Sequence, residues 1–429
     1  MAGAVAVVLA LVAGQRVADA QAQASWDRLS DRTSVVEPVA RSVSVRWSLD
    51  PSTLMAVNQG ATWRGTVVGP LLASDGSIGI ASLDDRDGHR RWTIPVLGPD
   101  ASRAGAQGQV MARASCHRVP EDASQVVCLV TDSVVRITDQ QANTTNASQV
   151  HLVVVDPKDG RVLAEHQLGA ELSSLEAVLR GGLTVIATSR AGRPEVVAVD
   201  AASGAERWRA AVPAAGGLGG FGAVGFGDLV AVVGVTGLDV LGLDGAIHRS
   251  VSLTSYAGAM PRSDGRLVLP QEAATLVVGP DRDVRLDGTE VGIASDDGSL
   301  PGLTLVSAGT MRAYDADGHQ RWELAGASPA GVVVLGGVVY VTRDGGVTAV
   351  DGSTGTVRWR TDLRGPLLTP LTDGRVLLVA TGADLAALDL RTGAVLWRAA
   401  LPSGHTDVMA FGGLLVARTP DGSSTDVMG

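Results

Sequence analysis

The stretch that decides the fold is LAALDLRTGAVLW, residues Leu385 to Trp397. Alternating small and apolar residues lead into Asp389, as expected of a strand inside a sheet. The aspartate carboxylate can accept backbone N–H groups in a turn, and Gly393 can supply the positive φ that closes a short hairpin loop. The next strand carries Trp397, a large planar side chain suited to packing between neighbouring sheets. The stretch therefore predicts a β-hairpin that docks on another sheet.

The same pattern occurs five times: an Asp, a Gly four residues later (three in one case), and a Trp four residues after the Gly. Five of the eight tryptophans have this setting. We interpret these residues as a structural docking motif, in which turn and wedge are built together, and not as a chemical site. The motif residues are Asp84, Gly88, Trp92, Asp200, Gly204, Trp208, Asp315, Gly318, Trp322, Asp351, Gly355, Trp359, Asp389, Gly393 and Trp397.

The spacing of the motif predicts a repeat of about 40 residues, with roughly four antiparallel strands in each unit. Two more units, at Asp156 and Asp244, lack the tryptophan, and both lie 44 residues from Asp200. The 71 residues from Asp244 to Asp315 have room for two units, one of them decayed around Leu276–Asp281. The 72 residues before Asp156 indicate one unit enlarged twice, by a cysteine hairpin and by the polar segment Asp139–Gln149. Units of this size predict an all-β fold, a β-propeller.

The two ends of the repeat region are expected to share one blade. Val43–Leu49 resembles a final strand without its preceding hairpin, and Val408–Arg418 resembles early strands without a final one. Joining them would leave no exposed edge at the ends of the array. Counting both this composite and the decayed unit gives nine blades, and discounting either gives eight. We predict eight four-stranded antiparallel blades, with seven as the alternative, and an N-terminal apolar helix.

Cys116 and Cys128 lie in two strand-like runs separated by the turn-like segment Pro120–Ser124. A hairpin of this kind can bring the two thiols within bonding distance, so we predict a disulfide. The alternative is two unrelated buried thiols. A disulfide closing this loop would contribute about 3 kcal/mol and would indicate an oxidising compartment.

The N-terminal run Ala2–Gly14 is almost entirely apolar and fits the apolar region of an export signal. No basic residue precedes it, and Val17–Ala20 is a poor cleavage site, so a truncated signal-anchor is the other interpretation. We predict a signal or anchor segment at residues 1–20, a stalk at 21–42 and a propeller at 43–429 with an insertion at about 113–149. The expected location is extracytoplasmic and membrane-anchored, with secretion as the alternative.

The charge balance argues against a nucleic-acid partner. The net charge is −10, and the sequence has a pI of about 5.2, whereas nucleic-acid binding requires a basic surface. Lys158 is the only lysine, while arginine is common, which we interpret as a compositional bias.

The unit Ala-x-Asp-x-x-Thr-Gly-x-x-x-Trp, present at Ala349–Trp359 and Ala387–Trp397, resembles the tryptophan-docking motif of propellers of the pyrroloquinoline quinone (PQQ) type. The resemblance covers roughly residues 43–420. It implies either of two branches, the quinoprotein alcohol dehydrogenases or the non-enzymatic BamB-like scaffold proteins of the cell envelope. The order of apolar segment, stalk and propeller is similar to the BamB-like branch.

The enzyme branch implies features that this sequence lacks. A quinoprotein dehydrogenase is expected to show adjacent cysteines, a tryptophan floor, a calcium site and a base, but here the cysteines are not adjacent and the docking motif uses most of the tryptophans. The acidic clusters Asp84–Asp87 and Asp296–Gly298 lack the ligand spacing of a calcium loop. No two of the seven histidines, at positions 89, 117, 151, 166, 248, 319 and 405, have metal-ligand spacing. We therefore expect no catalytic, cofactor or metal site.

The predicted function is a non-catalytic extracytoplasmic scaffold for protein interactions at the cell envelope, as the BamB-like resemblance implies. Its partners would be an envelope protein and, through the N-terminal segment, the membrane. Residues 113–149 are the predicted binding surface, because loops can vary without disturbing the blades. The alternatives are a propeller that binds or senses a small molecule in its channel and a PQQ-dependent dehydrogenase.

Overall fold

The computed structural model describes most of the chain from Val35 onward. The described residues are 35–104, 110–120, 122–138, 141–172, 174–190, 193–216, 221–255, 258–262, 264–326, 329–343, 345–365, 367–382, 384–420 and 424–429. They form two compact units, one containing residues 45–290 with the C-terminal strand and the other containing residues 35–44 and 291–420.

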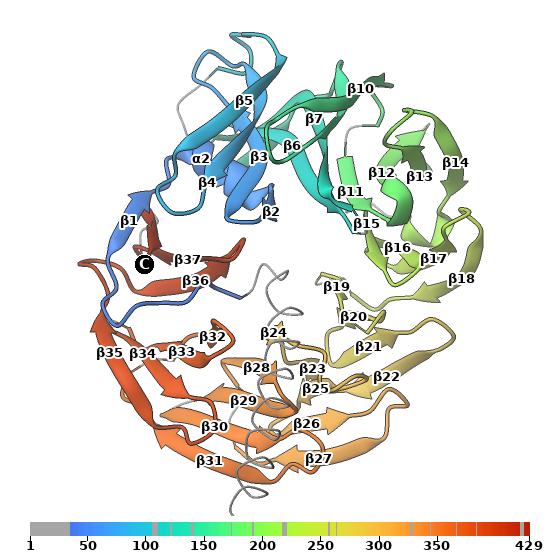
Figure 1. The fold of residues 1–429 in the computed structure, drawn as a ribbon. Helices are drawn as coiled ribbons and strands as arrows, with labels where there is room; N and C mark the ends of the chain where they lie inside the picture. The colour runs from blue at the N-terminus through green and yellow to red at the C-terminus, as the bar shows by residue number, and fades with distance from the viewer. Residues whose placement is uncertain are drawn as a thin grey trace, which may run out of the picture. The chain divides into compact units, whose positions relative to one another are not determined.

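The unit of residues 45–290 contains five complete sheets of four or five strands (Figure 1). They are β2 (Ala61–Trp63), β3 (Thr66–Leu72), β4 (Ile78–Asp84) and β5 (Arg90–Leu97); β6 (Val110–Val119), β7 (Asp122–Thr138), β8 (Gln141–Thr144), β9 (Val150–Val155) and β10 (Val162–Leu168); β11 (Ser174–Val178), β12 (Leu183–Arg190), β13 (Arg193–Asp200) and β14 (Glu206–Ala211); β15 (Phe221–Phe226), β16 (Leu229–Gly234), β17 (Gly237–Gly242) and β18 (Ile247–Ser252); and β19 (Met260–Pro261), β20 (Leu267–Pro270), β21 (Ala274–Val278) and β22 (Asp283–Asp287). Strand β23 (Thr289–Glu290) and the short helices η1 (Arg180–Gly182) and η2 (Pro213–Ala215) also lie in this unit.

The other unit contains antiparallel sheets built from the rest of the chain. Its strands are β24 (Ile293–Asp296), β25 (Thr304–Ser307), β26 (Met311–Tyr314), β27 (Gln320–Leu324), β28 (Gly331–Leu335), β29 (Val338–Arg343), β30 (Gly346–Asp351), β31 (Val357–Asp362), β32 (Leu371–Thr372), β33 (Val376–Ala380), β34 (Asp384–Asp389), β35 (Val395–Ala400), β36 (Asp407–Phe411) and β37 (Leu414–Arg418). Strand β24 differs from its neighbours, since it pairs in parallel with β28.

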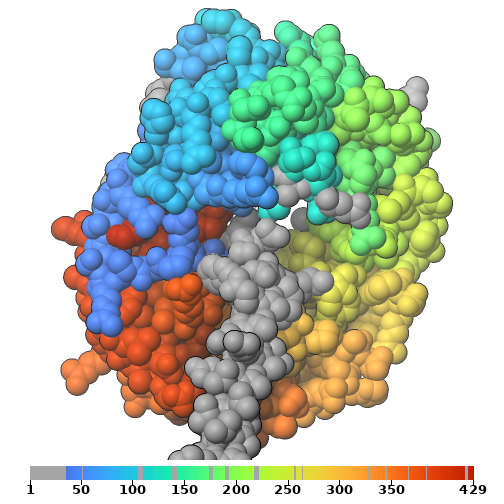
Figure 2. Space-filling model, viewed as in Figure 1, coloured from blue at the N-terminus to red at the C-terminus, as the bar shows by residue number. Residues whose placement is uncertain are grey.

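The core of each unit lies between neighbouring sheets. The middle strands are almost completely buried, as in β16 and β17, whereas the last strand of each sheet alternates between exposed and partly buried residues. One cluster joins Ile78 and Ile80 of the first sheet to Cys128, Val130 and Val153 of the second. Figure 2 shows the atoms of these two sheets, blue to green, packed side by side. Two-sided burial explains why the middle strands read as unbroken Val, Leu and Ala runs.

The N-terminal strand completes its sheet with a strand from the other end of the chain. Strand β1 (Val45–Ser48) pairs antiparallel with β38 (Thr425–Met428), and Trp47 lies opposite Val427. This confirms that Val43–Leu49 finds its partner in the C-terminal region.

In the part of the chain that the structure describes, the strands form nine sheets, and the fold is a β-propeller of nine blades. The prediction of eight blades, with seven as the alternative, is therefore wrong. Both doubtful units form sheets: β19–β22 contain the decayed unit around Leu276–Asp281, and the terminal strands supply another.

Helix α2 (Pro51–Asn58) follows β1 and was not predicted. Asp50 caps its first turn, because the Oδ1 atom accepts the backbone N–H groups of Ser52 (2.8 Å) and Thr53 (2.9 Å). Pro51 occupies the first helical position, where its missing N–H costs nothing. The sequence Asp-Pro-Ser-Thr at residues 50–53, a capping residue followed by proline, is the signal from which this helix start could have been predicted.

The predicted N-terminal apolar helix at residues 1–20 lies outside the described residues, as does most of the predicted stalk at 21–42. Its described end packs against its own unit: Val35 and Val36 are buried, and Val35 forms a parallel bridge with Thr372. Glu37 N–H donates to the carbonyl of Gly413 (3.1 Å). Within the described ranges, no helix is long and apolar enough to cross a membrane.

Candidate functional site

The docking tryptophans hold neighbouring sheets together through their indole N–H groups. Four motif tryptophans, and Trp47 outside the motif, each donate from Nε1 to a backbone carbonyl in the turn before the last strand of the next sheet. The pairs are Trp47 with Asp85 (3.1 Å), Trp92 with Pro157 (3.3 Å), Trp208 with Leu243 (2.7 Å), Trp322 with Gly352 (2.8 Å) and Trp359 with Leu390 (3.1 Å). Trp397 lies in β35 opposite Ala387.

The motif glycines receive these indoles at close range. At Gly393, which has a φ of 72°, an added Cβ would lie 2.4 Å from Cε3 of Trp359. Gly88 lies in the same way against Trp47, and Gly355 against Trp322. Each docking contact therefore joins the Trp of one unit to the Asp–Gly turn of the next unit. The Asp–Gly turn and the Trp of a single motif thus take part in two different contacts, one with each neighbouring sheet.

Two units that lack the tryptophan use other side chains. In the Asp156 unit, Ala164 stands four residues after Gly160, in the slot where the motif has its tryptophan. His166, two residues later, places Nε2 3.0 Å from the carbonyl oxygen of Ala202. At the Asp244 unit Arg249 occupies the slot and donates to the carbonyl of Pro280 (2.9 Å) and to Asp283 (3.1 Å). The sequence reasoning missed both, although Arg249 stands four residues after Gly245, as the tryptophans do after their glycines.

Four of the five motif aspartates pair with the arginine that precedes the tryptophan of the same motif, whereas Leu396 precedes Trp397. The ion pairs are Arg91 with Asp84 (2.6 Å), Arg207 with Asp200 (2.5 Å), Arg321 with Asp315 (3.3 Å) and Arg358 with Asp351 (2.7 Å). The Arg207 guanidinium and the Ser203 hydroxyl lower the pKa of Asp200 to about 2. We interpreted the many arginines as a compositional bias, and so did not predict these ion pairs. The sequence signal for them is the Arg-Trp dipeptide that recurs in the motif.

The acidic clusters serve turns. Ligand atoms of Asp315, Asp317 and His319 lie within 4.8 Å of one another, the one such group of three among the described residues. The Asp315 Oδ1 atom, however, accepts the N–H groups of Asp317 (3.0 Å) and His319 (2.9 Å). Buried Asp297 likewise accepts the N–H groups of Ser299 (2.9 Å) and Gly336 (2.8 Å). These carboxylates carry out the turn chemistry expected from the sequence.

The cysteines and the docking tryptophans do not offer the lining that a quinone cofactor would need. Cys116 and Cys128 are 12 residues apart and buried within a sheet, where they cannot form a vicinal disulfide over a ring. The indoles of the docking tryptophans lie on turn glycines, so their faces are engaged between sheets. No catalytic step through such a group follows from these residues.

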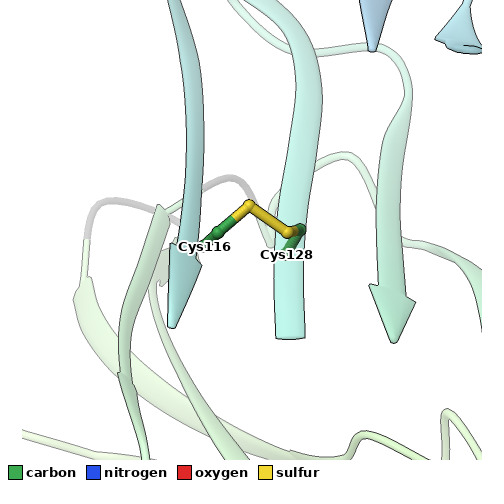
Figure 3. Close-up of a disulfide and its surroundings, with 2 residues drawn as sticks. All are labelled: Cys116 and Cys128. Carbon is green, nitrogen blue, oxygen red and sulfur yellow. A yellow bond between two sulfur atoms is a disulfide. The ribbon is translucent and has the colours of Figure 1, made fainter. Parts of the chain in front are cut away.

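The two cysteines form a disulfide between neighbouring strands (Figure 3). Cys116 of β6 lies opposite Cys128 of β7, and both side chains are buried. The cysteine hairpin thus supplies the first two strands of its sheet. Of the expected insertion at about 113–149, residues 113–119 and 122–131 belong to the blade strands β6 and β7, and residues 132–149 form an addition, which we call the excursion.

The excursion extends the sheet. Strand β7 continues to Thr138, and β8 returns beside it, with Thr144 opposite Val135. At the base, Oδ1 of Asp132 accepts the N–H groups of Ser148 (2.7 Å) and Gln149 (3.1 Å). Burial opposes ionisation of Asp132, but bonds from Ser148 and Gln149 outweigh it and lower the pKa of this carboxyl. Thr145 N–H also donates to the carbonyl of Val134 (3.0 Å).

The loop after β5 supports the excursion. Arg136 of β7 donates to the carbonyl of Ser102. Buried Arg103 holds this loop by donating to the carbonyls of Gly76 (2.9 Å) and Gly98 (2.6 Å). Ser102, Arg136 and residues 143–149 therefore form one surface, the excursion surface, whose residues 143–146 are exposed and uncharged. It is the candidate interaction site.

A family model described as outer membrane protein assembly factor BamB matches residues 148–220 and 307–426, a little under half of the chain. Both matched segments contain the docking motif. Over these two segments the chain matches the PQQ-like β-propeller repeat proteins. This confirms the resemblance drawn from the motif.

Three similar solved structures have low sequence identity. BamB from Moraxella catarrhalis is 16% identical, with 90% of this chain and 99% of that chain covered and a TM-score of 0.39. A europium-containing methanol dehydrogenase is 14% identical, with coverage of 91% and 86% and a TM-score of 0.42. A eukaryotic initiation factor is 8% identical, with coverage of 80% and 87% and a TM-score of 0.46. No curated protein matches the chain significantly.

Proposed function

We propose that this PQQ-like propeller is a non-catalytic scaffold that binds a protein partner through the excursion surface. The observation that carries the proposal is the excursion itself. It adds 18 residues, 132–149, between two strands of one sheet, and hydrogen bonds of Asp132, Thr145 and Arg136 connect its described residues to one another and to the loop after β5. A surface whose described residues are already held by hydrogen bonds binds at a lower entropic cost than a flexible loop.

Two observations support an extracytoplasmic partner. A disulfide between Cys116 and Cys128 suits an oxidising compartment. The matching family model describes an outer membrane protein assembly factor, which is a protein of the cell envelope. Anchoring to the membrane through residues 1–20 remains a prediction from the sequence.

The proposal can be tested by removing the excursion without breaking the blade. Asp132 N–H donates to the carbonyl of Gln149 (3.2 Å), and Thr131 pairs with Val150. Replacing residues 133–148 with Asn-Gly should therefore close the same strands with a two-residue turn. We expect crosslinking and affinity purification from membranes to recover a partner with the wild type and about tenfold less with the replacement.

The control is Val357→Asp, which alters an exposed side chain on an outer strand (49% exposed) and should leave recovery unchanged. Thermal unfolding and circular dichroism establish that both variants fold. Equal recovery with and without the excursion would contradict the proposed surface. Recovery of the wild type only as a soluble monomer without a partner would contradict the scaffold function.

The dehydrogenase alternative has its own test. Purified protein is incubated with PQQ and calcium, then assayed for bound cofactor absorbance and dye-linked alcohol oxidation. We expect neither signal, because the docking contacts use the tryptophans. Either signal would overturn the non-catalytic proposal.

A further inference from the structure

The sheet of β6–β10 has fewer strands beside the excursion than beside the rest of the blade. Away from the excursion, where Val126–Thr131 of β7 pairs with β9, the strand order is β10-β9-β7-β6. Strand β8 continues the row of β9 along β7, because Val150 pairs with Thr131 and Thr144 pairs with Val135. Strand β10 ends at Leu168, which pairs with Val150. Among the described residues, the part of the sheet beside the excursion therefore has three strands, and no strand continues the row of β10 beside β8.

The outer edge of β8 presents backbone groups toward that position. In an antiparallel pair, every second residue directs its N–H and C=O toward the partner strand, and the residues between direct theirs away. Thr145 bonds inward to Val134 (3.0 Å), so the N–H and C=O of Thr144 point away from β7. Residues 143–146 are exposed, so this edge is accessible within the described part of the molecule.

This edge lacks the features that normally prevent strand addition. Exposed edges are usually protected by charged side chains, prolines or bulges. The last strands β5, β14, β18, β22, β27, β31 and β35 each contain an arginine, and β10 contains a glutamate. Gln141–Thr144 contains no charged residue and no proline, and its pairing with β7 has no register shift.

We propose that β8 accepts an extended segment of the protein partner as an additional antiparallel strand, in line with β10. The inference rests on the proposed function, because it assigns a binding mode to the excursion surface. Main-chain hydrogen bonds would supply the affinity, as in other cases of strand addition. The fitting segment is uncharged, because β8 offers no counter-charge and an unpaired charge is costly to desolvate.

The test compares Thr144→Pro with Thr144→Val. Proline removes the outward N–H and places its ring at the edge, while the inward bonds of residues 143 and 145 are kept. Valine keeps the N–H and changes only the side chain. The probe is a phage-displayed library of random ten-residue peptides, selected on the full-length wild-type protein and measured on each variant. We expect uncharged peptides to be enriched, to bind Thr144→Pro about tenfold more weakly, and to bind Thr144→Val about as well as the wild type.

The inference is overturned if no peptide is enriched or if the peptides bind Thr144→Pro as well as the wild type. It is also overturned if β8 pairs with β8 of a second copy, which would be observed as a dimer that Thr144→Pro dissociates. Crosslinking in membranes distinguishes a failure of the strand-addition inference from a failure of the proposed function. If the Asn-Gly replacement abolishes partner recovery while Thr144→Pro does not, the surface is correct and strand addition is wrong. If neither change affects recovery, both proposals fail. Unchanged thermal unfolding shows that Thr144→Pro is folded.

Discussion

At the scale of single residues, one backbone carbonyl can organise a whole docking contact. Leu390 O accepts the indole N–H of Trp359 (3.1 Å) and the hydroxyl of Tyr340 (3.1 Å), and the two rings lie 5.9 Å apart. Burial raises the pKa of Tyr340 to about 12, so this hydroxyl remains a donor at physiological pH. The turn residue Gly393 lies against the same indole. Adding even one methyl group at Gly393 should therefore lower the free energy of unfolding substantially.

We predict that Gly393→Ala is much more destabilising than Gly345→Ala. Both glycines have positive φ, 72° and 81°, which costs alanine roughly 1 to 2 kcal/mol. At Gly393 the added Cβ also meets Trp359 at 2.4 Å, whereas nothing lies within 4 Å at Gly345. Chemical unfolding should give a loss of roughly 2 to 5 kcal/mol for Gly393→Ala. Equal losses would show that the docking contact does not constrain Gly393.

We predict that Asp200 stabilises the fold in a pH-dependent way. Its pKa is about 2 in the folded state, below the ordinary 3.8, so the ionised carboxylate stabilises the protein above about pH 4. This stabilisation is lost as the pH falls from about 4 to 2. Asp200→Asn should therefore melt below the wild type at pH 6, and the difference should shrink toward pH 2. A difference that stays constant with pH would contradict the ion pair with Arg207.

The sequence predicted the tryptophan contacts but not their substitutes. A planar apolar side chain at a fixed spacing is easy to recognise, whereas His166 and Arg249 are ordinary surface residue types. His166 also stands two residues beyond the expected slot. Its contact depends on the neighbouring turn at Ala202, which is 36 residues away in the chain.

At the scale of elements, the disulfide joins β7, which leads into the excursion, to its neighbour β6. We predict that the double variant Cys116→Ala and Cys128→Ala loses about 3 kcal/mol of unfolding free energy, because the closed loop restricts the unfolded chain. Thiol titration of the denatured, unreduced wild type should detect no free thiol. Two free thiols in that assay would contradict the disulfide.

The boundaries of elements were harder to predict than their existence. The polar segment Asp139–Gln149 was recognised by its composition, but its neighbours Asp132–Thr138 were not, since Val134 and Val135 look like ordinary strand residues. They are strand residues, yet Val135 pairs with Thr144 of β8, and Val134 accepts the N–H of Thr145, both within the excursion. Pairing partners decide which part of a strand belongs to a sheet, and a single sequence does not contain that information.

At the scale of the whole molecule, the chain ends contribute to the same fold. Val427 of β38 is 1% exposed and lies opposite Trp47, whereas Val45 of β1 is 42% exposed. We predict that Val427→Asp costs roughly 3 kcal/mol or more, because it buries an unpaired charge. Val45→Asp should stay within about 0.5 kcal/mol of the wild type. Similar unfolding midpoints for the two variants would contradict the pairing of β1 with β38.

The blade number shows how far a repeat motif predicts architecture. The five complete motifs fixed the unit length and the fold class, but a blade needs only alternating strands and a buried face. The β19–β22 sheet forms around Leu267, Leu269 and Val278 without the Asp–Gly–Trp pattern. Counting motifs therefore gave too few blades, because packing tolerates the loss of the turn residues.

The most direct test of the scaffold function is to locate where a partner contacts the chain. A photo-crosslinking amino acid is placed at Asn143 or Asn146 on the excursion surface and, as a control, at Val357 on an outer strand, in full-length protein within intact cells. We predict a discrete crosslinked partner from Asn143 and Asn146, identified by mass spectrometry, and none from Val357. Crosslinks only from Val357, or none from any position, would contradict a scaffold that binds through the excursion surface.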